Sequence, residues 1–410
     1  MNSTLVILSN RYPYIPGEEF LKAELDVLSN HFEKILLIPT NRDIIYDQKN
    51  CRDIPENVEV IHLFEGDNRT SFSRVMDILK SPINMRWFRA ELSHSLHHGI
   101  KAPLIMLNRL ALACEIKNKL QNITGGNQDF IYYSYWLTPS ALALAILKEE
   151  GKITRAISRV HGGDLYAERH SPAYIPFQGK VISALDRTYP ISENGLKYLA
   201  QKHSGMENKL LVQRLGTEPT LDFAQINWNK QSDSLRVVSC SYLKPVKRIH
   251  LLAEALKHCH FPVEWTHIGD GPQREQIEGV VKTIPEQIKV KMLGNKTNDE
   301  IMELYRTHEF DLFVNVSESE GIPVTIMEAF SFGIPVLATD VGGTSEVVNA
   351  DNGILLQKDI EPLDIATQLT NFYSMQIEEK AVKGKMAYST WNNSYNADKN
   401  YTKFATLLKD

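Results

Sequence analysis

The stretch SESEGIPVTIMEAFSFGIPVLATDVGGTSEVV, residues 317–348, carries the clearest structural signal in the sequence. The apolar run before it, DLFVNV at 311–316, is typical of a buried strand. Pro323 suits the first position of a helix, where its missing N–H is not needed, and Gly333 suits the residue just past the helix end. We therefore predict a strand, a polar loop and a helix over 323–332.

The same alternation continues on both sides of this segment. Short β-rich runs and amphipathic stretches of helical length predict βαβ units and a parallel sheet covered on both faces. The predicted strands lie at 235–240, 263–268, 288–293, 311–316, 335–339 and 353–357. The predicted helices lie near 248–260, 272–284, 298–307, 323–332 and 361–374.

The first half of the chain repeats the pattern less regularly. Its predicted strands are 4–9, 34–39, 58–63, 129–135, 154–160, 185–192 and 209–215, and its predicted helices are 18–31, 138–149 and 193–203. Since 410 residues exceed the usual size of one domain, we predict an α/β protein with two Rossmann-like domains. Their predicted bounds are 1–208 and 209–385, with a C-terminal helix at 386–410 that packs back on the first domain.

The composition excludes several classes of protein. With 43% hydrophobic and 23% charged residues the chain is globular, and its net charge of -5 argues against a nucleic-acid binder. The four cysteines form no CxxC pair, which favours a reducing compartment over a disulfide framework or a zinc site. No apolar run approaches the roughly 20 residues of a membrane span, and the N-terminus resembles a strand more than a signal peptide. We expect a cytoplasmic protein, with the inner face of the membrane as an alternative location.

Residues 68–120 differ from the rest of the chain in charge. Nine Lys or Arg residues stand against three acids, a local excess of nine minus three, or +6. Met85, Trp87 and Phe88 lie among them. A basic helical region with exposed aromatic residues can lie on an anionic bilayer. The alternative is a solvated helical insertion whose aromatic residues belong to the core.

The loop before the helix at 323–332 is a candidate anion site. A helix N-terminus offers free N–H groups and partial positive charge, and in open α/β sheets ligands bind at the carboxyl ends of the strands. Glu320 precedes this helix and Glu328 lies within it. Both carboxylates could accept hydrogen bonds from sugar or ribose hydroxyls. The alternative is that Glu320 caps the helix and Glu328 lies on the surface.

The segment EGIPVTIME, followed by AFSFGIPVLATDVGGTSEVV, resembles the signature of a large family of retaining GT-B glycosyltransferases. This family, similar to glycosyltransferase family 4, includes sucrose synthases and many bacterial polysaccharide transferases. Its hallmark is a Glu, seven residues and a second Glu, within the frame EGxPxxxxEAxxxGxPVxAxxxGGxxE. The resemblance implies two Rossmann-like domains facing across a cleft, the second of which binds the nucleotide-sugar. The donor-binding residues that it implies are Gly321, Ile322, Pro323, Val324 and Glu328, with Glu320 as a catalytic residue.

Three other segments of the second half align with this family. GDGP at 269–272 resembles a turn whose glycines have a structural or a ligand role, and 293–305 resembles the loop that receives the nucleobase. The diphosphate-binding segment, SYLKPVKRI at 241–249, departs from the usual GRLxxxKG, because Tyr242 stands where Arg is common. Lys247 matches the family Lys and Lys244 matches a variant form, with Arg248 as a weaker third cation. These cations would hold the leaving diphosphate, or the segment is simply a basic surface loop.

The first half carries further positions that match the family. RVHGGDLYAER at 159–169 resembles the HGxD segment, which implies that His161 contacts the donor sugar and has a catalytic role. A structural histidine is the alternative. Asp164 could orient a neighbour or the acceptor. In ISEN at 191–194, Ser192 is a candidate helix cap.

The loop RYPYIPGEEFLKAEL at 11–25 follows the first predicted strand. Many relatives have a Gly–Gly pair there, whereas this chain has Gly17 followed by Glu18. Glu18 or Glu19 could bind a polar acceptor, or could be first-turn acids of the next helix, which the helix dipole favours. In SYWLTP at 134–139, Tyr135 and Trp136 would stack on a sugar or, more simply, belong to the core.

The resemblance implies transfer with retention from a nucleotide-sugar, with UDP or GDP as the expected base, to a glycan or lipid-linked acceptor of cell-surface polysaccharide. Front-face transfer without a metal is expected, because no family position supplies a carboxylate nucleophile. The rival readings are a sugar phosphorylase or epimerase on the same fold and a non-catalytic binding subunit. A dehydrogenase is disfavoured, because GDG at 269–271 is followed by Pro-Gln-Arg and does not complete GxGxxG.

Overall fold

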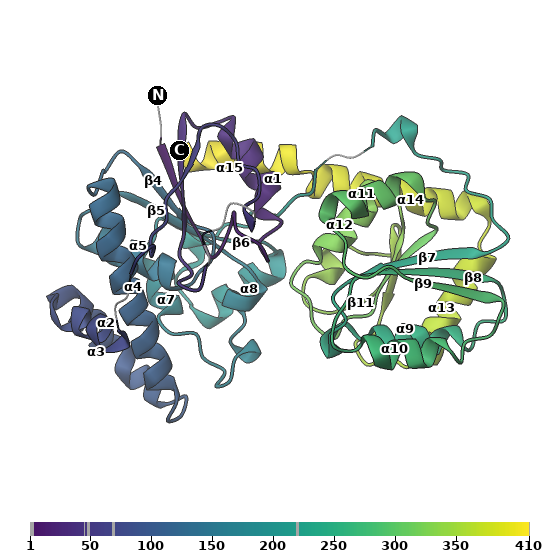
Figure 1. Cartoon of the computed structure of the whole chain (residues 1–410), viewed down its shortest axis with the longest axis horizontal. Helices are drawn as coiled ribbons and strands as arrows, with labels where there is room; N and C mark the ends of the chain where they lie inside the picture. Colours follow the sequence, from purple (N-terminus) through teal and green to yellow (C-terminus); the bar gives the residue numbers. More distant parts are fainter. Residues whose placement is uncertain (1–3, 45, 47–49, 68–69, 219–220, 410) are drawn as a thin grey trace. The chain divides into compact units, whose positions relative to one another are not determined.

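The chain forms two compact units in the computed structural model (Figure 1), which describes residues 4–44, 46, 50–67, 70–218 and 221–409. Unit 1 comprises Met1–Arg214 and Tyr401–Asp410, and unit 2 comprises Leu215–Asn400. The division after Arg214 differs from the predicted one after residue 208. None of the helices in the described part of the chain is long and apolar enough to cross a lipid bilayer.

Unit 2 contains a six-stranded parallel sheet in the order β12-β11-β10-β7-β8-β9. Its strands are β7 Leu235–Cys240, β8 Val263–Ile268, β9 Ile288–Met292, β10 Leu312–Asn315, β11 Val336–Thr339 and β12 Gly353–Leu356. All six predicted strands are confirmed, trimmed by no more than one residue at either end. The strands β10 and β11 are buried along their whole length, which explains their apolar sequences, whereas the edge strand β9 alternates buried and exposed residues.

The helices of unit 2 also follow the prediction closely. They are α9 Ile249–Leu256, α10 Arg274–Val281, α11 Asn298–Thr307, α12 Val324–Ser331, α13 Pro362–Ser374 and α14 Ile377–Ser394. Pro323 is the residue before α12 and not its first helical residue, because its ψ of 112° is extended. Gly333 follows α12 with a φ of +65°, a left-handed conformation that glycine adopts at little cost, as predicted.

Unit 1 contains a second six-stranded parallel sheet, in the order β3-β2-β1-β4-β5-β6. Its strands are β1 Thr4–Ser9, β2 Lys34–Pro39, β3 Val58–Val60, β4 Ile131–Ser134, β5 Arg155–Val160 and β6 Arg187–Pro190. The predicted strand at 209–215 is wrong. Leu210 forms only an isolated bridge to Thr188, and Pro190 in β6 has no N–H with which to extend the ladder.

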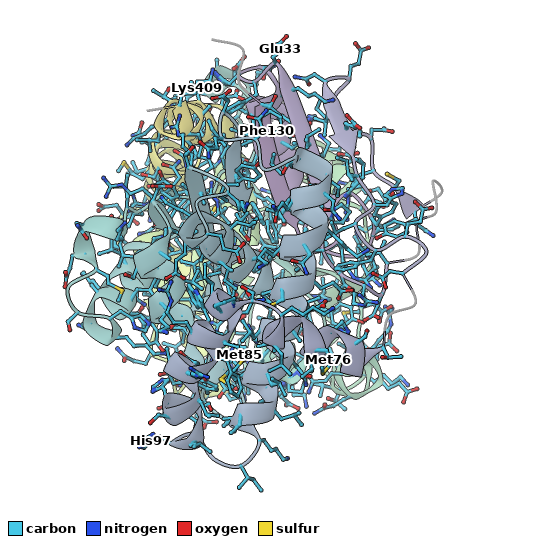
Figure 2. The ribbon with its side chains drawn as sticks, turned by 90° about the vertical axis from the view of Figure 1, so that its left-hand side faces the viewer. Glu33, Met76, Met85, His97, Phe130 and Lys409 are labelled. Carbon is cyan, nitrogen blue, oxygen red and sulfur yellow. The ribbon has the colours of Figure 1, made fainter. Side chains whose placement is uncertain are left out.

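The helices of unit 1 include an insertion over the basic region, formed by α2 Ser71–Leu79, α3 Pro82–Leu96 and α4 Ala102–Thr124 (Figure 2). The others are α1 Leu21–Ser29, α5 Pro139–Glu149, α6 Gly162–Leu165, α7 Gln178–Ala184, α8 Glu193–Lys202 and α15 Ala397–Lys409. Ser192 caps α8 as predicted, since its hydroxyl accepts a hydrogen bond from the Gly195 N–H at 2.9 Å.

The aromatic residues of the insertion belong to the core. Trp87 is 5% exposed and lies beside Phe177, while Met85 and Phe88 are partly buried against the same cluster. These three residues therefore do not form the bilayer contact that was one of two readings of the sequence. Arg69, the first cation of this region, lies outside the described residues.

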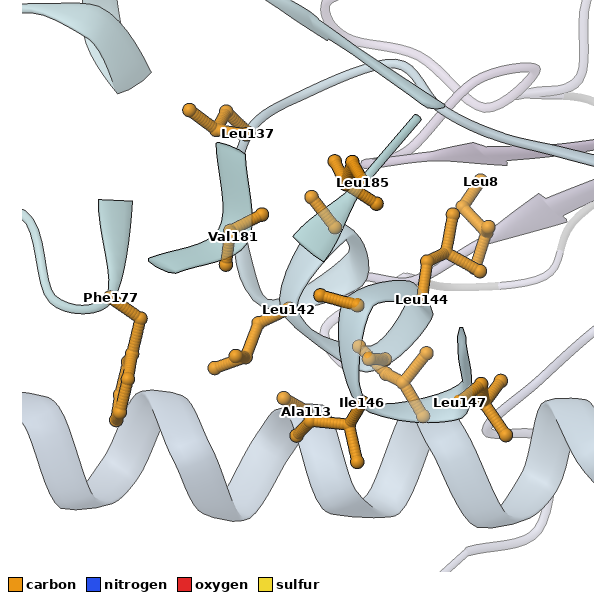
Figure 3. Packing of buried hydrophobic residues seen from close by; sticks show 14 of the residues in the cluster. Leu8, Ala113, Leu137, Leu142, Leu144, Ile146, Leu147, Phe177, Val181 and Leu185 are labelled. Carbon is orange, nitrogen blue, oxygen red and sulfur yellow. The ribbon is translucent and has the colours of Figure 1, made fainter. Parts of the chain in front are cut away.

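The core of unit 1 is centred on α5, whose residues Ala141–Leu147 are all buried. Figure 3 shows α5 lying over α4, with Ala113 of α4 beneath Ile146 and with Leu144 directed toward Leu8 of β1. An apolar helix that is covered on all sides fixes the loop before it, which carries several of the candidate site residues.

The predicted C-terminal helix at 386–410 is two helices, α14 and α15. The break falls at Tyr395 and Asn396, where Thr217 pairs with the chain. The Thr217 N–H donates to the Tyr395 carbonyl at 2.9 Å, and the Ala397 N–H donates to the Thr217 carbonyl at 3.0 Å. These bonds remove two backbone groups from a continuous helix, so the helix ends and a new one begins.

A fully buried cation joins distant parts of unit 1. Arg159 of β5 pairs with Glu24 of α1 at 3.1 Å, and both side chains are 0% exposed. Its Nε donates to the Tyr133 hydroxyl at 2.9 Å, its Nη1 donates to the Gln213 carbonyl at 2.7 Å, and it lies 4.6 Å from the Phe404 ring centroid. Arg159 therefore contacts both segments of unit 1, the one that ends at Arg214 and the one that begins at Tyr401.

We predict that Arg159→Met lowers the free energy of unfolding by about 3–5 kcal/mol, because the Glu24 carboxylate stays buried without its counter-charge. Urea unfolding of both proteins measures the change. Lys34→Met is the control, since Lys34 pairs with Glu59 at the surface, where the side chains are 52% and 55% exposed, and an exposed pair contributes about 0–1 kcal/mol. Equal losses in the two variants would contradict the prediction.

Candidate functional site

The two carboxylates predicted at α12 are both buried. Glu320 is 9% exposed and Glu328 is 7% exposed. Glu320 accepts hydrogen bonds from Lys247 Nζ at 2.6 Å and from Asn315 Nδ2 at 3.3 Å, both through Oε1. Pro323 is the N-cap residue of α12 and no side chain caps the helix. The reading of Glu320 as a helix cap and of Glu328 as a surface residue is therefore wrong.

Two glycines shape the backbone that carries Glu320. The Gly343 N–H donates to the Gly321 carbonyl at 2.7 Å, so the 341–343 loop lies directly against the 320–321 loop. A Cβ on Gly342 would lie 2.0 Å from the Glu320 carbonyl oxygen, which no side chain permits. The glycine pair of the sequence frame thus sets the position of Glu320 at the entrance to α12.

The chain from Gly321 to Val324 leads directly into α12. Ile322 is buried, and Val324 is the first helical residue. In the first helical turn the Ile326 N–H donates to the Pro323 carbonyl at 3.1 Å. The N–H groups of Val324 and Thr325 have no partner within the helix, so they remain available to an anion beside Glu320. The predicted donor segment therefore lies between the end of β10 and the N-terminus of α12.

The three predicted cations have different surroundings. Lys247 is bound to Glu320, whereas Lys244 is exposed and its ammonium lies 4.9 Å from the centroid of the Tyr242 ring. Arg248 donates to the carbonyls of Val316, Lys358 and Ser317 at 2.7, 2.9 and 3.0 Å. Arg248 is therefore better explained as a structural residue that holds the end of β10 than as the third donor-binding cation we predicted.

The turn at 269–272 has a structural role that bears on these cations. A Cβ on Gly269 would lie 2.0 Å from the Ser241 carbonyl oxygen, and one on Gly271 would lie 2.7 Å from that of Leu243. The Leu243 N–H also donates to the Asp270 carbonyl at 2.9 Å. The glycines allow this contact, which fixes the segment that carries Lys244 and Lys247.

Within the described part of the chain, the Glu328 carboxylate accepts a hydrogen bond from one side chain, which the sequence reading missed. The amide of Asn298, the first residue of α11, donates to its Oε1 at 2.7 Å. Burial raises the pKa of Glu328 to about 7, and the Asn298 hydrogen bond opposes this rise. Asn298 lies in the segment matched to the nucleobase loop, but nothing local identified its amide as a partner of Glu328.

In unit 1, His161 follows β5 and is 5% exposed. Its ring centroid lies 4.3 Å from that of Trp136 and 4.8 Å from that of Tyr135. Neither ring nitrogen has a hydrogen-bond partner among the residues that the structure describes. Burial and the Arg159 guanidinium hold the pKa of His161 well below its usual range, so the imidazole is neutral. It can offer one donor and one acceptor to a ligand.

Asp164 links two loops at the carboxyl edge of this sheet. Its carboxylate accepts hydrogen bonds from the Leu137 N–H at 2.6 Å and from the His161 N–H at 2.7 Å. Burial raises its pKa to about 6, against the effect of these N–H groups. Asp164 therefore orients a neighbour, His161, which was one of its two predicted roles.

Glu18 is not a first-turn acid of the next helix, and its role in binding an acceptor stays a prediction. It precedes α1, which begins only at Leu21, and its carboxylate points back into its own loop. It accepts hydrogen bonds from the backbone N–H groups of Asn10, Arg11 and Tyr12 and from the Trp136 indole, at 3.0, 2.5, 2.7 and 2.6 Å. Gly17 beside it has a φ of +99°. Together they shape the loop after β1.

Trp136 is partly exposed, and Tyr135 is fully buried. The core reading therefore holds for Tyr135. Over the described ranges, His, Cys, Asp and Glu side chains form no group of three or more that could hold a metal ion.

Comparison with known proteins agrees with this arrangement. Residues 222–388 match the family model described as glycosyl transferases group 1. The putative colanic acid biosynthesis glycosyltransferase WcaL of Escherichia coli (strain K12) is 26% identical over 66% of this chain and 68% of its own length. The putative teichuronic acid biosynthesis glycosyltransferase TuaC of Bacillus subtilis (strain 168) is 25% identical, again over 66% and 68%.

Solved structures show the same fold over the whole chain. TarM aligns with a TM-score of 0.70 and 12% identity, covering 100% of this chain and 99% of its own. Anabaena Alr3699/HepE in complex with UDP and glucose aligns with a TM-score of 0.64 and 18% identity, covering 99% of both chains. The two parallel sheets with their helices are therefore the two Rossmann-like domains of the GT-B fold.

The burial of Glu328 predicts a pH-dependent stability. Its folded pKa of about 7 lies above the ordinary value of 4.5, so the folded state takes up a proton between these values. The wild type should lose stability as pH rises from 4.5 to 7, and Glu328→Gln should lose less, because only the loss from other buried acids such as Asp164 remains.

At pH 4.5 we expect Glu328→Gln to have the melting temperature of the wild type. At pH 8 we expect it to melt at a higher temperature, because its free energy of unfolding is larger by up to about 3 kcal/mol. The exposed Glu286→Gln is the control and should match the wild type at both pH values. A Glu328→Gln variant that is less stable than the wild type at pH 8 would show that the carboxylate is not strained by burial.

Proposed function

We propose that this chain, which has the GT-B fold and whose residues 222–388 match the glycosyl transferases group 1 model, is a glycosyltransferase. It would transfer a sugar with retention from a nucleotide-sugar to a glycan or lipid-linked acceptor. The observation that carries this proposal is the ion pair between Lys247 and Glu320, 2.6 Å apart, just before the N-terminus of α12. Within α12, Glu328 accepts a hydrogen bond from Asn298 of α11. The relatives named for colanic acid, teichuronic acid and O-antigen synthesis support cell-surface polysaccharide as the product class.

The donor would be held by unit 2. Its diphosphate would bind the N-terminus of α12 with Lys244 and Lys247, because cations and free N–H groups stabilise the charge that grows on a leaving phosphate. The donor phosphate would compete with Glu320 for Lys247, which frees Glu320 to accept hydrogen bonds from sugar hydroxyls. Glu328, as a carboxylate, would accept from the ribose hydroxyls. The UDP bound to HepE makes a uridine nucleotide the first donor to test.

The reaction that we propose is a front-face transfer. The bond between the anomeric carbon and the leaving phosphate oxygen breaks through an oxocarbenium-like state, and the acceptor oxygen bonds to the same face. The acceptor proton passes to a phosphate oxygen of the leaving group. The two lysines would neutralise the diphosphate, so we propose that no metal ion is required. His161, a neutral side chain with two unpartnered ring nitrogens among the described residues, would contact a hydroxyl of the donor sugar.

We predict that Glu320→Ala lowers kcat by about 100-fold or more, because the donor ring loses its positioning carboxylate, while the melting temperature changes little. Turnover with the donor found below and thermal unfolding measure the two effects. Glu318→Ala, an exposed acid two residues earlier in the same loop, should leave turnover unchanged. Normal transfer by the Glu320→Ala enzyme would refute the assignment of this site.

The donor itself can be found by thermal-shift measurement with UDP, GDP, ADP and their sugar conjugates, with and without EDTA. A nucleotide at 100 times its dissociation constant should raise the free energy of unfolding by about 2.7 kcal/mol. We expect the nucleotides of one base to raise the melting temperature, equally with and without EDTA. We expect Lys247→Met to abolish this rise. Silence across the panel would instead favour a non-catalytic subunit, and turnover that depends on inorganic phosphate would favour a sugar phosphorylase.

A further inference from the structure

The corner between α3 and α4 exposes aliphatic side chains that no described residue covers. Ile100 is 96% exposed, and Leu96 and Leu104 are each 61% exposed. We call these three residues the apolar corner. α3 ends at Leu96 and α4 begins at Ala102, so all three lie at a single helix-to-helix turn. In Figure 2, His97 marks this corner at the lower edge of the ribbon.

The apolar corner stands on an ordered base. Ser95, Ala102 and Met106, which flank its residues in the sequence, are all 0% exposed. The Ala102 N–H donates to the Gly99 carbonyl at 3.1 Å, and Gly99 has a φ of +96° that closes the turn. The exposed side chains are therefore held outward by packed helices, and no rearrangement is required to present them.

The chain segment that forms the apolar corner carries no acidic residue. Residues 92–114 contain no Asp or Glu. The side chains of Lys101, within the corner, and of Arg89, two helical turns before Leu96, make no hydrogen bond or ion pair with any described residue. Four other cations of the insertion are paired, since Lys80, Arg86, Lys117 and Lys119 lie against Asp77, Glu149, Glu150 and Asp67. The unpaired charge of Lys101 thus lies within the apolar corner.

We propose that the apolar corner inserts into the interface of an anionic lipid bilayer, with Lys101 and Arg89 at the level of the headgroups. Peripheral binding to a bilayer requires a few exposed aliphatic side chains and nearby cations, and this corner has both. A stable protein interface requires about 800 Å² per partner and central aromatic anchors. The aromatic ring beside the apolar corner, that of Tyr174 stacked on His98, is only 3% exposed and offers no such anchor. The surface differs from the one centred on Met85, Trp87 and Phe88 that the sequence suggested.

Co-sedimentation with lipid vesicles tests the proposal on the full chain without substrate, so its outcome is independent of the sugar-transfer reaction. We expect the wild type to bind vesicles of phosphatidylcholine mixed with phosphatidylglycerol, and to bind pure phosphatidylcholine far more weakly. Ile100→Glu and Leu96→Glu should each weaken binding to the mixed vesicles by about tenfold or more, because a charged side chain replaces one that inserts. Lys101→Glu should weaken binding to the mixed vesicles and leave binding to pure phosphatidylcholine unchanged.

Leu363→Glu is the matched control, because Leu363 is 62% exposed at the start of α13 in unit 2 and should not contribute. Melting temperatures of all variants should equal that of the wild type, since each changed side chain is exposed. The proposal would be overturned if the wild type bound neither kind of vesicle, or if Ile100→Glu bound the mixed vesicles as well as the wild type does. A wild-type dimer in light scattering that Ile100→Glu dissociates would overturn it in favour of a second copy of the chain.

Discussion

The ion pair between Lys247 and Glu320 is the interaction on which the candidate site of unit 2 depends. It joins the segment after β7 to the segment after β10, two neighbouring strands whose carboxyl ends share one edge of the sheet. The carboxylate is almost fully buried, and burying a charge without a partner costs several kcal/mol. This pair requires the two loops to lie close together, which explains the glycines at 269, 271, 342 and 343. A Cβ at any of these positions would push neighbouring loops apart.

Unit 1 uses its acids in a different way. Glu18 and Asp164 lie in loops that would suit a polar ligand, yet their carboxylates accept hydrogen bonds from backbone N–H groups of the loops themselves. What these bonds leave available is the His161 imidazole, packed against Trp136 and kept neutral by its surroundings. The acidic groups of this edge thus hold the backbone in place, while neither ring nitrogen of His161 has a hydrogen-bond partner among the described residues.

Local sequence patterns predicted the sheets well and the site in part. The β-rich composition of 235–240 and 263–268 predicted β7 and β8 to the residue, although both strands carry polar side chains. Residues 209–215 form no strand because of Pro190, and the last helix is broken at Tyr395 because of Thr217. In both cases the residue responsible is distant in sequence, so no local pattern could predict the contact. In the same way, the sequence frame around 320–328 identified both glutamates. The hydrogen bond from Asn298 to Glu328 and those from Arg248 to backbone carbonyls could be seen only in the structure.

The buried Arg159 has a consequence for anyone who wishes to produce unit 1 alone. Its guanidinium lies against Phe404, in a helix that follows the whole of unit 2 in the sequence. A polypeptide that stops at Arg214 would therefore expose this cation and the apolar rings around it. The isolated unit is better made as a circular permutant, with α15 joined ahead of β1, or as two fragments that reassemble.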